Sequence, residues 1–296
     1  MTYTKCNLCE RKCNINRYEK IGVCGANNKL KVARAALHYW EEPCISGEEG
    51  SGTIFFSNCN LKCLYCQNKK ISTGGYGKYI TIDRFSNICL ELQEQGANNI
   101  NLVTPTHYVP SIIKGIKKAR KKGLTLPIVY NTSSYESIET LKKLDQIVDV
   151  YLPDLKYKND ELAKNYSNIK NYFDIATRNI EEMYNQVGNP IFNKKGIMLK
   201  GVIVRVLLLP GHIDDAKEII KYLYDKYQNN IYISIMNQYT PINKIERFPN
   251  LNCKVKDEEY NDLIDYACDL GITNAFIQEG ETCTESFIPD FNKIGV

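Results

Sequence analysis

The sequence lacks long apolar runs and carries little net charge. No apolar stretch approaches the roughly 18–20 residues that a membrane-spanning helix needs. The first residues, MTYTKCNLCERK, contain no apolar segment of the kind found in signal peptides. We therefore expect a cytoplasmic protein that does not bind membranes. The net charge of the 296 residues is only +4, so the overall charge does not indicate a nucleic-acid partner.

Cysteine, in contrast, is abundant, with 12 residues in the chain. Disulfides are rare in the cytoplasm, so this number needs another explanation. Seven of the cysteines fall into two local groups before residue 70. Such grouping favours metal or cluster binding over a disulfide framework. Cys44 has no cysteine neighbour at ligand spacing and is predicted to be a free thiol, and Cys89 lies on the apolar face of a predicted helix.

The second group follows a short β-branched and aromatic run, residues 53–56, within GTIFFSNCNLKCLYCQN. Cys59, Cys63 and Cys66 are spaced C-x3-C-x2-C. Iron–sulfur cubanes normally take four cysteine ligands, so three thiolates from one loop leave one iron open. At an open iron a small molecule can bind and accept an electron. This group therefore predicts a [4Fe–4S] cluster with a ligand-binding position.

The first group lies at the N-terminus in the pattern C-x2-C-x3-C-x10-C, formed by Cys6, Cys9, Cys13 and Cys24. Four thiolates at this spacing suit a tetrahedral structural zinc, which is the preferred interpretation, or a second iron–sulfur cluster. Unligated buried thiols are the third interpretation. Residues 1–34 carry eight Lys or Arg and only two acids. This surplus of positive charge would offset the charge of a metal tetrathiolate, or it is a solvated surface.

After the cysteine loop, strand-like and helix-like segments alternate. This alternation predicts βαβ units and a parallel sheet, here an α/β partial (β/α)6 barrel. We expect a cysteine-rich N-terminal module and connector over residues 1–51 and the barrel over residues 52–296. The predicted strands are 53–56, 99–104, 127–131, 148–154, 201–209 and 231–236, with a short last one at 274–278. The predicted helices are 81–95, 110–122, 135–146, a polar Tyr-rich region at 158–187, 214–227 and 257–270.

Polar residues follow each of these strands. In α/β barrels the chemistry gathers at the carboxyl ends of the strands, so these side chains are candidates for one site. They are Thr104, Thr106, Asn131, Ser133, Asp154 and Lys156. Arg205 lies inside an otherwise apolar strand, where an unpaired charge costs several kcal/mol. Its partner is predicted to be a ligand carboxylate or, alternatively, an acid of the chain such as Asp154.

The stretch FSNCNLKCLYCQN resembles the signature of the radical S-adenosylmethionine (SAM) superfamily. The chain is similar to its activase-like branch, which includes pyruvate formate-lyase activating enzymes. It most resembles a subgroup of that branch with an N-terminal cysteine module. The stretches that carry this resemblance are CNLCERKCNINR, GVCG, HYWEEPCISG, NLVTPTHY, YNTSSYE, YLPDLKY, LLLPGH and MNQYTP.

The resemblance implies roles for individual residues. The three loop cysteines would hold the [4Fe–4S] cluster, whose open iron binds SAM, with Tyr65 beside the adenine. Asp154 and Lys156 match an Asp-x-Lys pair near SAM, and Arg205 matches an arginine that meets the SAM carboxylate. Thr104, Thr106, Asn131 and Ser133 would contact the methionine and ribose. Most of the superfamily has a Gly-Gly-Glu-like turn where this chain has Thr104-Pro105-Thr106.

The resemblance also implies reductive cleavage of SAM to methionine and a 5′-deoxyadenosyl radical, which abstracts a hydrogen. An activase-like enzyme would take it from a glycine of a partner protein, with flavodoxin or ferredoxin as electron donor. A second hypothesis is a radical SAM enzyme acting on a small molecule or a peptide side chain, with His107 and Tyr239 as substrate contacts. A third is a non-catalytic iron–sulfur protein that transfers electrons.

Overall fold

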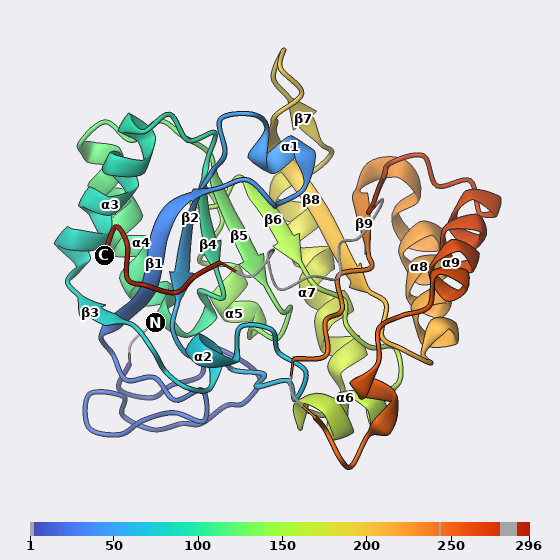
Figure 1. Cartoon of the computed structure of the whole chain (residues 1–296). Helices are drawn as coiled ribbons and strands as arrows, with labels where there is room; N and C mark the ends of the chain where they lie inside the picture. Colours follow the sequence, from blue (N-terminus) through green and yellow to red (C-terminus); the bar gives the residue numbers. More distant parts are fainter. Residues whose placement is uncertain (1–2, 243, 279–288) are drawn as a thin grey trace.

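A computed structural model of the chain describes residues 3–242, 244–278 and 289–296. Its centre is a ten-stranded, mostly parallel sheet in the order β10-β9-β8-β6-β5-β4-β2-β1-β3, with β7 beside β8 (Figure 1). The strands are β1 (Leu30–His38), β2 (Ser51–Phe56), β3 (Lys78–Ile80), β4 (Ile100–Val103), β5 (Ile128–Thr132), β6 (Val150–Pro153), β7 (Ile191–Phe192), β8 (Met198–Leu207), β9 (Tyr232–Met236) and β10 (Ala275–Ile277).

The sheet is parallel from β2 to β10 and does not close. Neighbouring strands from β2 through β4, β5, β6, β8 and β9 to β10 run parallel, whereas β1 pairs antiparallel with β2 and β3 antiparallel with β1. In the described part of the chain the order ends at β10 on one side and β3 on the other. The predicted partial barrel is thus confirmed. The proposed boundary after residue 51 falls inside β2, directly after its first residue, and β1 and β2 are adjacent strands of the sheet.

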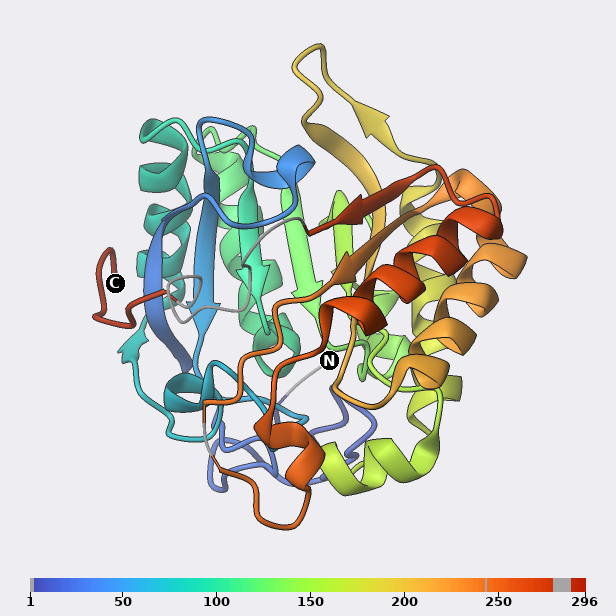
Figure 2. The ribbon, with the colours of Figure 1, turned by 45° about the vertical axis from the view of Figure 1, so that its right-hand side comes forward.

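The longer helices pack on the outer side of the curved sheet (Figures 1 and 2). Their apolar residues recur at helical spacing, as in α3, where Phe85, Ile88, Cys89 and Leu92 are buried. The helices are α1 (Pro43–Ser46), α2 (Lys69–Ser72), α3 (Ile82–Glu94), α4 (Val109–Lys121), α5 (Ile138–Leu141), α6 (Asp160–Ser167), α7 (Tyr172–Val187), α8 (Ile213–Tyr227) and α9 (Asp257–Asp269). Short 3₁₀ turns occur at η1 (Thr106–Tyr108), η2 (Gln228–Asn230) and η3 (Pro249–Asn252).

The structure differs from the predicted elements in several places. The helical region 158–187 divides into α6 and α7 because Asn168 and Asn171 take left-handed conformations, with φ of 49° and 52°, which an α-helix cannot contain. The helix predicted at 135–146 is reduced to α5. The acidic loop before β2 contains α1, in which Cys44 is a buried free thiol. β3 and β7 were not predicted.

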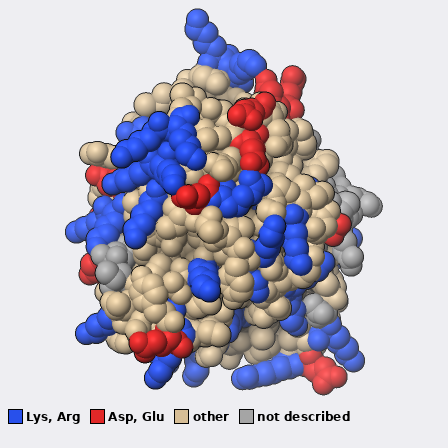
Figure 3. Space-filling model, turned by 90° about the vertical axis from the view of Figure 1, so that its left-hand side faces the viewer, with Lys and Arg blue, Asp and Glu red and all other residues tan. Residues whose placement is uncertain are grey.

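Lysine and arginine side chains dominate the face that contains α3 and α4 (Figure 3). Lys118, near the end of α4, forms an ion pair with Asp83 of α3, and Lys122 donates to Asn87 Oδ1 at 2.7 Å. Cations at a helix C-terminus interact favourably with the helix dipole. These contacts are typical of a solvated basic run at the end of a helix.

The N-terminal residues lie at the carboxyl ends of the parallel strands, at the lower end of the molecule in Figure 1. Residues 3–28 contain no helix, and their one backbone bridge joins Cys9 to Glu136, which follows β5. In the described ranges, no helix is long and apolar enough to cross a membrane.

Candidate active site

The three cysteines of the loop after β2 line one cavity. All six residues of β2 are buried, and the loop then turns twice through left-handed conformations, at Asn58 (φ 76°) and Lys62 (φ 63°). These turns bring Cys59, Cys63 and Cys66 to a cavity of about 240 Å³ at the carboxyl ends of the strands. The predicted grouping of these thiols around one space agrees with the structure.

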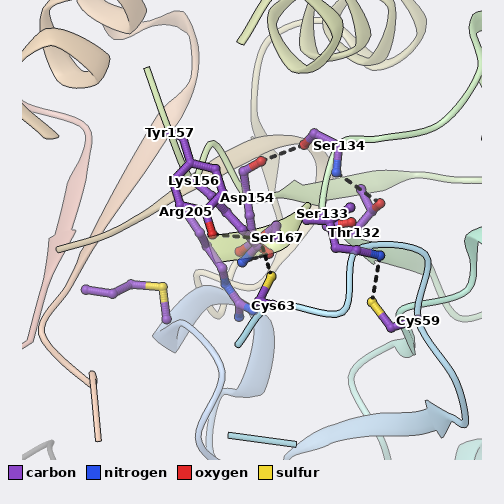
Figure 4. Close-up of polar contacts among 12 residues, drawn as sticks. Cys59, Cys63, Thr132, Ser133, Ser134, Asp154, Lys156, Tyr157, Ser167 and Arg205 are labelled. Atoms are coloured by element: carbon purple, nitrogen blue, oxygen red, sulfur yellow. Dashed lines mark hydrogen bonds and ion pairs between the residues drawn. The ribbon is translucent and has the colours of Figure 1, made fainter. Parts of the chain in front are cut away.

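Each of the three sulfurs accepts a hydrogen bond. Cys59 Sγ accepts from Leu61 N (3.4 Å), Cys63 Sγ from Ser167 Oγ (2.9 Å) and Cys66 Sγ from Ser72 Oγ (3.3 Å). Figure 4 shows the bonds to Cys59 and Cys63. Hydrogen bonds to the sulfurs stabilise thiolate charge and tune the reduction potential of a bound cluster.

Burial makes two of these thiols, those of Cys59 and Cys66, weaker acids in the metal-free chain. Burial and the neighbouring Cys63 thiol raise the pKa of Cys59 to about 12. Burial and Cys63 also raise the pKa of Cys66, which the Ser72 hydrogen bond and Lys156 partly oppose. A bound metal deprotonates its thiol ligands outright, so the protons leave when iron binds.

The ends of β4 and β5 contribute polar groups to the same cavity. Thr104, Asn131 and Ser133 line it, together with Thr132, which the sequence did not single out. Thr104 has a left-handed conformation, φ 57°, and its N–H donates to Asn131 O at 2.9 Å. The Ser133 hydroxyl is buried without a hydrogen-bond partner among the described residues. Such an orphaned group at a cavity indicates a missing ligand.

Thr106 is not among the residues that line the cavity. Its hydroxyl donates to the buried carboxylate of Glu136 at 2.6 Å, and the Thr132 hydroxyl donates to the same carboxylate. Burial raises the pKa of Glu136, although the Thr106 and Thr132 hydrogen bonds lower it in part. Of the two threonines in the Thr-Pro-Thr turn, the structure brings only Thr104 to the cavity.

Asp154 and Lys156 follow β6 and form an ion pair in the cavity wall. Lys156 Nζ lies 2.8 Å from Asp154 Oδ2, and the two side chains are only 16% and 22% exposed. Burial lowers the pKa of Lys156, but Asp154 and the Cys63 thiol raise it more, so the net direction is upward. Lys156 therefore stays protonated and places a positive charge near the cluster loop.

Arg205 of β8 is paired within the chain, but its partners are Glu41 and Glu42. Its Nε donates to Glu42 Oε1 at 2.8 Å and its Nη2 to Glu42 Oε2 at 2.7 Å, and Nη2 also donates to Glu41. Asp154, the alternative acid, pairs with β8 only through a backbone bridge to Arg205. The expected acid partner thus comes from the loop between β1 and α1.

A profile of the radical SAM superfamily matches residues 53–223. The chain belongs to the radical SAM superfamily. It is also 30% identical over 280 residues to an uncharacterised protein of Methanocaldococcus jannaschii, a match that covers 90% of this chain and 75% of that protein.

The solved structures that this radical SAM chain resembles have low sequence identity to it. HydG, a maturase of the [FeFe]-hydrogenase, is 16% identical with a TM-score of 0.52, over 80% of this chain and 54% of that one. A domain of a pyruvate-formate lyase-activating enzyme from Bacteroides vulgatus is 15% identical with a TM-score of 0.42, over 58% and 91%. The HydG match agrees with the partial-barrel fold.

Radical SAM membership implies a [4Fe–4S] cluster and SAM, and the cavity residues fit both. Three thiols on one loop are the donor set for three irons. The same cavity is lined by the Lys156 ammonium, the Arg205 guanidinium and the Ser133 hydroxyl, which has no hydrogen-bond partner among the described residues. Two nitrogens of Arg205 bind the glutamates. Charged and hydrogen-bonding groups around one cavity suit a zwitterionic ligand such as SAM.

Tyr65 connects the cavity wall to a cluster ligand through three hydrogen bonds. Its hydroxyl lies 2.7 Å from the Tyr157 hydroxyl. The Tyr157 hydroxyl lies 2.7 Å from Ser167 Oγ, and Ser167 Oγ donates to Cys63 Sγ. The Tyr65 ring packs edge-on against Tyr157 and Tyr166. The aromatic residue before the third cysteine therefore fixes the loop as well as lining the cavity.

Several cavity residues were not predicted. Glu41, Trp40 and His38 line it from the end of β1; the motif HYWEEP was noted in the sequence, but its pairing with Arg205 was not. His38 packs edge-on against Phe55 with 5.7 Å between ring centroids, as a packing histidine does. Tyr239 lines the cavity as expected, and its hydroxyl also donates to Leu251 O at 2.6 Å.

His107 is placed away from the cavity. It is 2% exposed, and its Nε2 lies 2.9 Å from the carbonyl oxygen of Ser57. Burial lowers its pKa to about 3. His107 is thus a neutral packing residue behind the cluster loop, and the structure does not support a substrate contact.

Proposed function

We propose that this protein is a radical SAM enzyme that cleaves SAM reductively and abstracts a hydrogen atom from a glycine of a partner protein. The observation that carries the first part is the convergence of three loop thiols, a buried lysine and an arginine on one polar cavity. When bound and reduced, the cluster supplies the electron that splits SAM into methionine and a 5′-deoxyadenosyl radical. The choice of a glycine rests on the resemblance to activating enzymes.

The residues of the chain would bind and orient the cofactors. Cys59, Cys63 and Cys66 would hold three irons. Lys156 is buried and positively charged, so it is suited to an anionic ligand group. Within the described residues, the hydrogen bonds of Arg205 use Nε and Nη2, so Nη1 would donate to the SAM carboxylate.

The hydroxyl and amide groups at the strand ends would position the rest of SAM. Thr104, Asn131 and Ser133 would contact its methionine and ribose, and Ser133 would gain the hydrogen-bond partner that it lacks. Tyr65 would lie against the adenine. The walls formed by β4, β5 and β6 would exclude water from the reacting atoms, because a reactive radical must be protected from side reactions.

A partner protein is favoured as substrate by the open side of the barrel. The sheet order of the described chain does not close, and Trp40 lines the cavity while remaining 61% exposed. An exposed aromatic residue at the edge of a cavity suits contact with a polypeptide. The electron donor would be a low-potential protein such as flavodoxin or ferredoxin.

The first test measures 5′-deoxyadenosine after anaerobic cluster reconstitution and addition of dithionite and SAM. The wild type should produce it, and Cys63→Ser should lose both the cluster and the product, because a hydroxyl is a poor ligand for iron in a cluster. Cys253→Ser changes an exposed thiol and should behave as wild type. No product from a protein with an intact cluster would favour the electron-transfer alternative.

The second test identifies the substrate class. Incubation of the active enzyme with each candidate partner protein should give a glycyl radical in electron spin resonance. If 5′-deoxyadenosine forms but no partner acquires a radical, the substrate is a small molecule or a peptide side chain.

A further inference from the structure

The four N-terminal cysteines, which the proposed SAM chemistry does not use, are gathered in one place. Cys6, Cys9 and Cys24 are buried and Cys13 is half-buried, and none forms a disulfide. A β-carbon placed on Gly22 would lie 3.3 Å from Cys24 Sγ and 3.9 Å from Cys13 Sγ. The glycine therefore leaves space between two thiols that are far apart in the sequence.

The spacing of these thiols does not suit a single ion. A tetrahedral zinc with Zn–S bonds of about 2.3 Å brings its sulfurs to about 3.8 Å from one another. In the described ranges, no three His, Cys, Asp or Glu side chains converge closely enough to hold one metal ion. That statement covers the N-terminal cysteines and the three cluster-loop cysteines alike. A cubane binds each thiolate through a different iron. It therefore fits four cysteine sulfurs that lie near one another but farther apart than the ligands of a single zinc ion.

We propose that Cys6, Cys9, Cys13 and Cys24 hold a second [4Fe–4S] cluster and that this cluster passes electrons to the cluster loop. Of the two metal interpretations that the cysteine spacing allows, this is the cluster rather than the zinc. The site itself is independent of the proposed function, whereas its role in electron transfer rests on it.

A buried arginine beside the cysteines indicates that the site is anionic. Arg17 is 0% exposed, and among the described residues no carboxylate lies within ion-pair distance of it. Its Nη1 lies 3.9 Å from Cys6 Sγ and donates to the His107 carbonyl at 2.6 Å, and its guanidinium lies over the Tyr3 ring at 4.9 Å. A permanently charged group in this position needs an anion. A cluster held by four thiolates carries net negative charge and supplies that anion.

The N-terminal site touches the cluster loop directly. Gly25, next to Cys24, has φ of 86°, and a β-carbon there would lie 3.2 Å from Asn58 Oδ1, next to Cys59. Only glycine allows both this conformation and this approach. Two residues thus connect a ligand of one site to a ligand of the other.

Arg11 forms the second connection. Arg11 lies between Cys9 and Cys13 in the sequence. Its guanidinium donates to four backbone carbonyls: Asn60 (2.9 Å), Leu61 (3.1 Å), Ser167 (3.1 Å) and Asn168 (2.6 Å). Two of these carbonyls belong to the loop between Cys59 and Cys63. This contact holds the two cysteine groups at a fixed separation, which an electron relay requires and an isolated structural metal does not.

The electron step is a simple exchange. A one-electron protein donor of the flavodoxin or ferredoxin class is oxidised as the N-terminal cluster is reduced from the 2+ to the 1+ state. The N-terminal cluster then returns to 2+ as the cluster at Cys59, Cys63 and Cys66 takes the electron. No bond is made or broken in this step.

The metal content of the wild-type full-length protein, prepared without oxygen, tests the site. We expect about eight irons per chain and no zinc, since each cubane contains four irons. Electron spin resonance of the reduced protein should show two clusters, of which SAM alters the signal of only one. About four irons per chain, with or without zinc, would overturn the proposal, and this measurement needs no variant to fold.

The double variant Cys9→Ala/Cys24→Ala tests the relay. It should retain about four irons and the SAM-sensitive signal, and production of 5′-deoxyadenosine with reduced flavodoxin should fall about tenfold or more. Production with dithionite, a small reductant that reaches the remaining cluster directly, should persist. Unchanged flavodoxin-driven production would overturn the relay.

The two proposals fail in different ways. If SAM altered no signal and dithionite gave no 5′-deoxyadenosine in the wild type, the proposed function would fail whatever the iron content. If the variant lost all iron, circular dichroism would distinguish unfolding from loss of a shared site. In that case the wild-type iron count and its two spin-resonance signals still decide whether the second cluster exists.

Discussion

Replacing Arg205 with methionine should destabilise the protein by about 3–5 kcal/mol near neutral pH. The variant leaves the carboxylates of Glu41 and Glu42 without their cation, and these side chains are only 7% and 5% exposed. Removal of one partner from a buried ion pair costs about 3–5 kcal/mol because the remaining charge is uncompensated. An overlapping range of about 2.7–4.1 kcal/mol follows if the pKa of one carboxyl rises by about 2–3 units, at 1.36 kcal/mol per unit.

The pH dependence of this loss gives a sharper test. In the wild type, burial raises the pKa of Glu42, but the Arg205 charge and hydrogen bonds lower it more, so the net direction is downward. That carboxylate contributes stability above its unfolded pKa and loses it as the pH falls through the folded value. In Arg205→Met only the smaller effects of a backbone hydrogen bond and of Ser234 oppose burial, so we expect the folded pKa to be raised and stability to fall as the pH rises. The difference between the two proteins should therefore grow from pH 5 to pH 8.

Urea denaturation under anaerobic, reducing conditions at pH 5, 6, 7 and 8 measures the effect. Arg205→Lys keeps the charge but not the two-pronged geometry, so it should recover part of the loss. Lys221→Met removes an exposed ion pair with Asp225 and should change little at any pH. A loss for Arg205→Met that is the same at pH 5 and pH 8 would refute the assignment of the cost to unpaired carboxylates.

Three further predictions concern single groups. Ser167→Ala removes a hydrogen bond to Cys63 Sγ. If this bond favours the reduced cluster by about 1 kcal/mol, the variant should have a reduction potential more negative by about 40 mV. An unchanged potential in a redox titration would contradict this. Burial raises the folded pKa of the Glu136 carboxyl, so the wild type should lose stability as the pH rises above about 4.5. Glu136→Gln cannot ionise and should not show this loss. Parallel pH–stability curves for the two proteins would contradict the prediction. His107 has its pKa lowered to about 3 by burial, so its imidazole resonances should not titrate between pH 5 and pH 8 in the folded protein, but should titrate near pH 6.5 in urea. Its protonation in the unfolded chain alone should lower stability as the pH falls below about 6.5, and a folded-state titration near neutral pH would contradict the burial argument.

The strands and the cluster loop could be predicted from the sequence because their signals are local. Buried parallel strands read as continuous β-branched runs, and the C-x3-C-x2-C loop places three ligands within eight residues. The two threonines of the Thr-Pro-Thr turn could not be separated in this way. Thr104 reaches the cavity because its backbone is left-handed (φ 57°), whereas Thr106, in the 3₁₀ turn that follows, binds Glu136. A motif does not specify such dihedral angles.

Long-range partners were the other limit. Glu42 and Arg205 are 163 positions apart, and the loop EEPCISGEEGSG has the composition of a solvated turn. The sequence showed that Arg205 needed an anion but not which one. The segment after β1 leads into α1, whose Cys44 and Ile45 pack in one apolar cluster with Ile203 of β8. This packing brings the two glutamates to Arg205.

Arg17 and Arg205 show that a buried arginine indicates a nearby negative charge, even where the sequence does not reveal which group carries it. Both are arginines in largely buried surroundings, and both must be compensated, since a guanidinium does not lose its proton. Arg205 meets two carboxylates of its own chain. Arg17 meets backbone carbonyls, aromatic faces and a cysteine sulfur. Carbonyl oxygens and ring faces are only partially negative, so the proposed cluster would supply the full countercharge at Arg17, because thiolates persist in a buried site when a metal holds them.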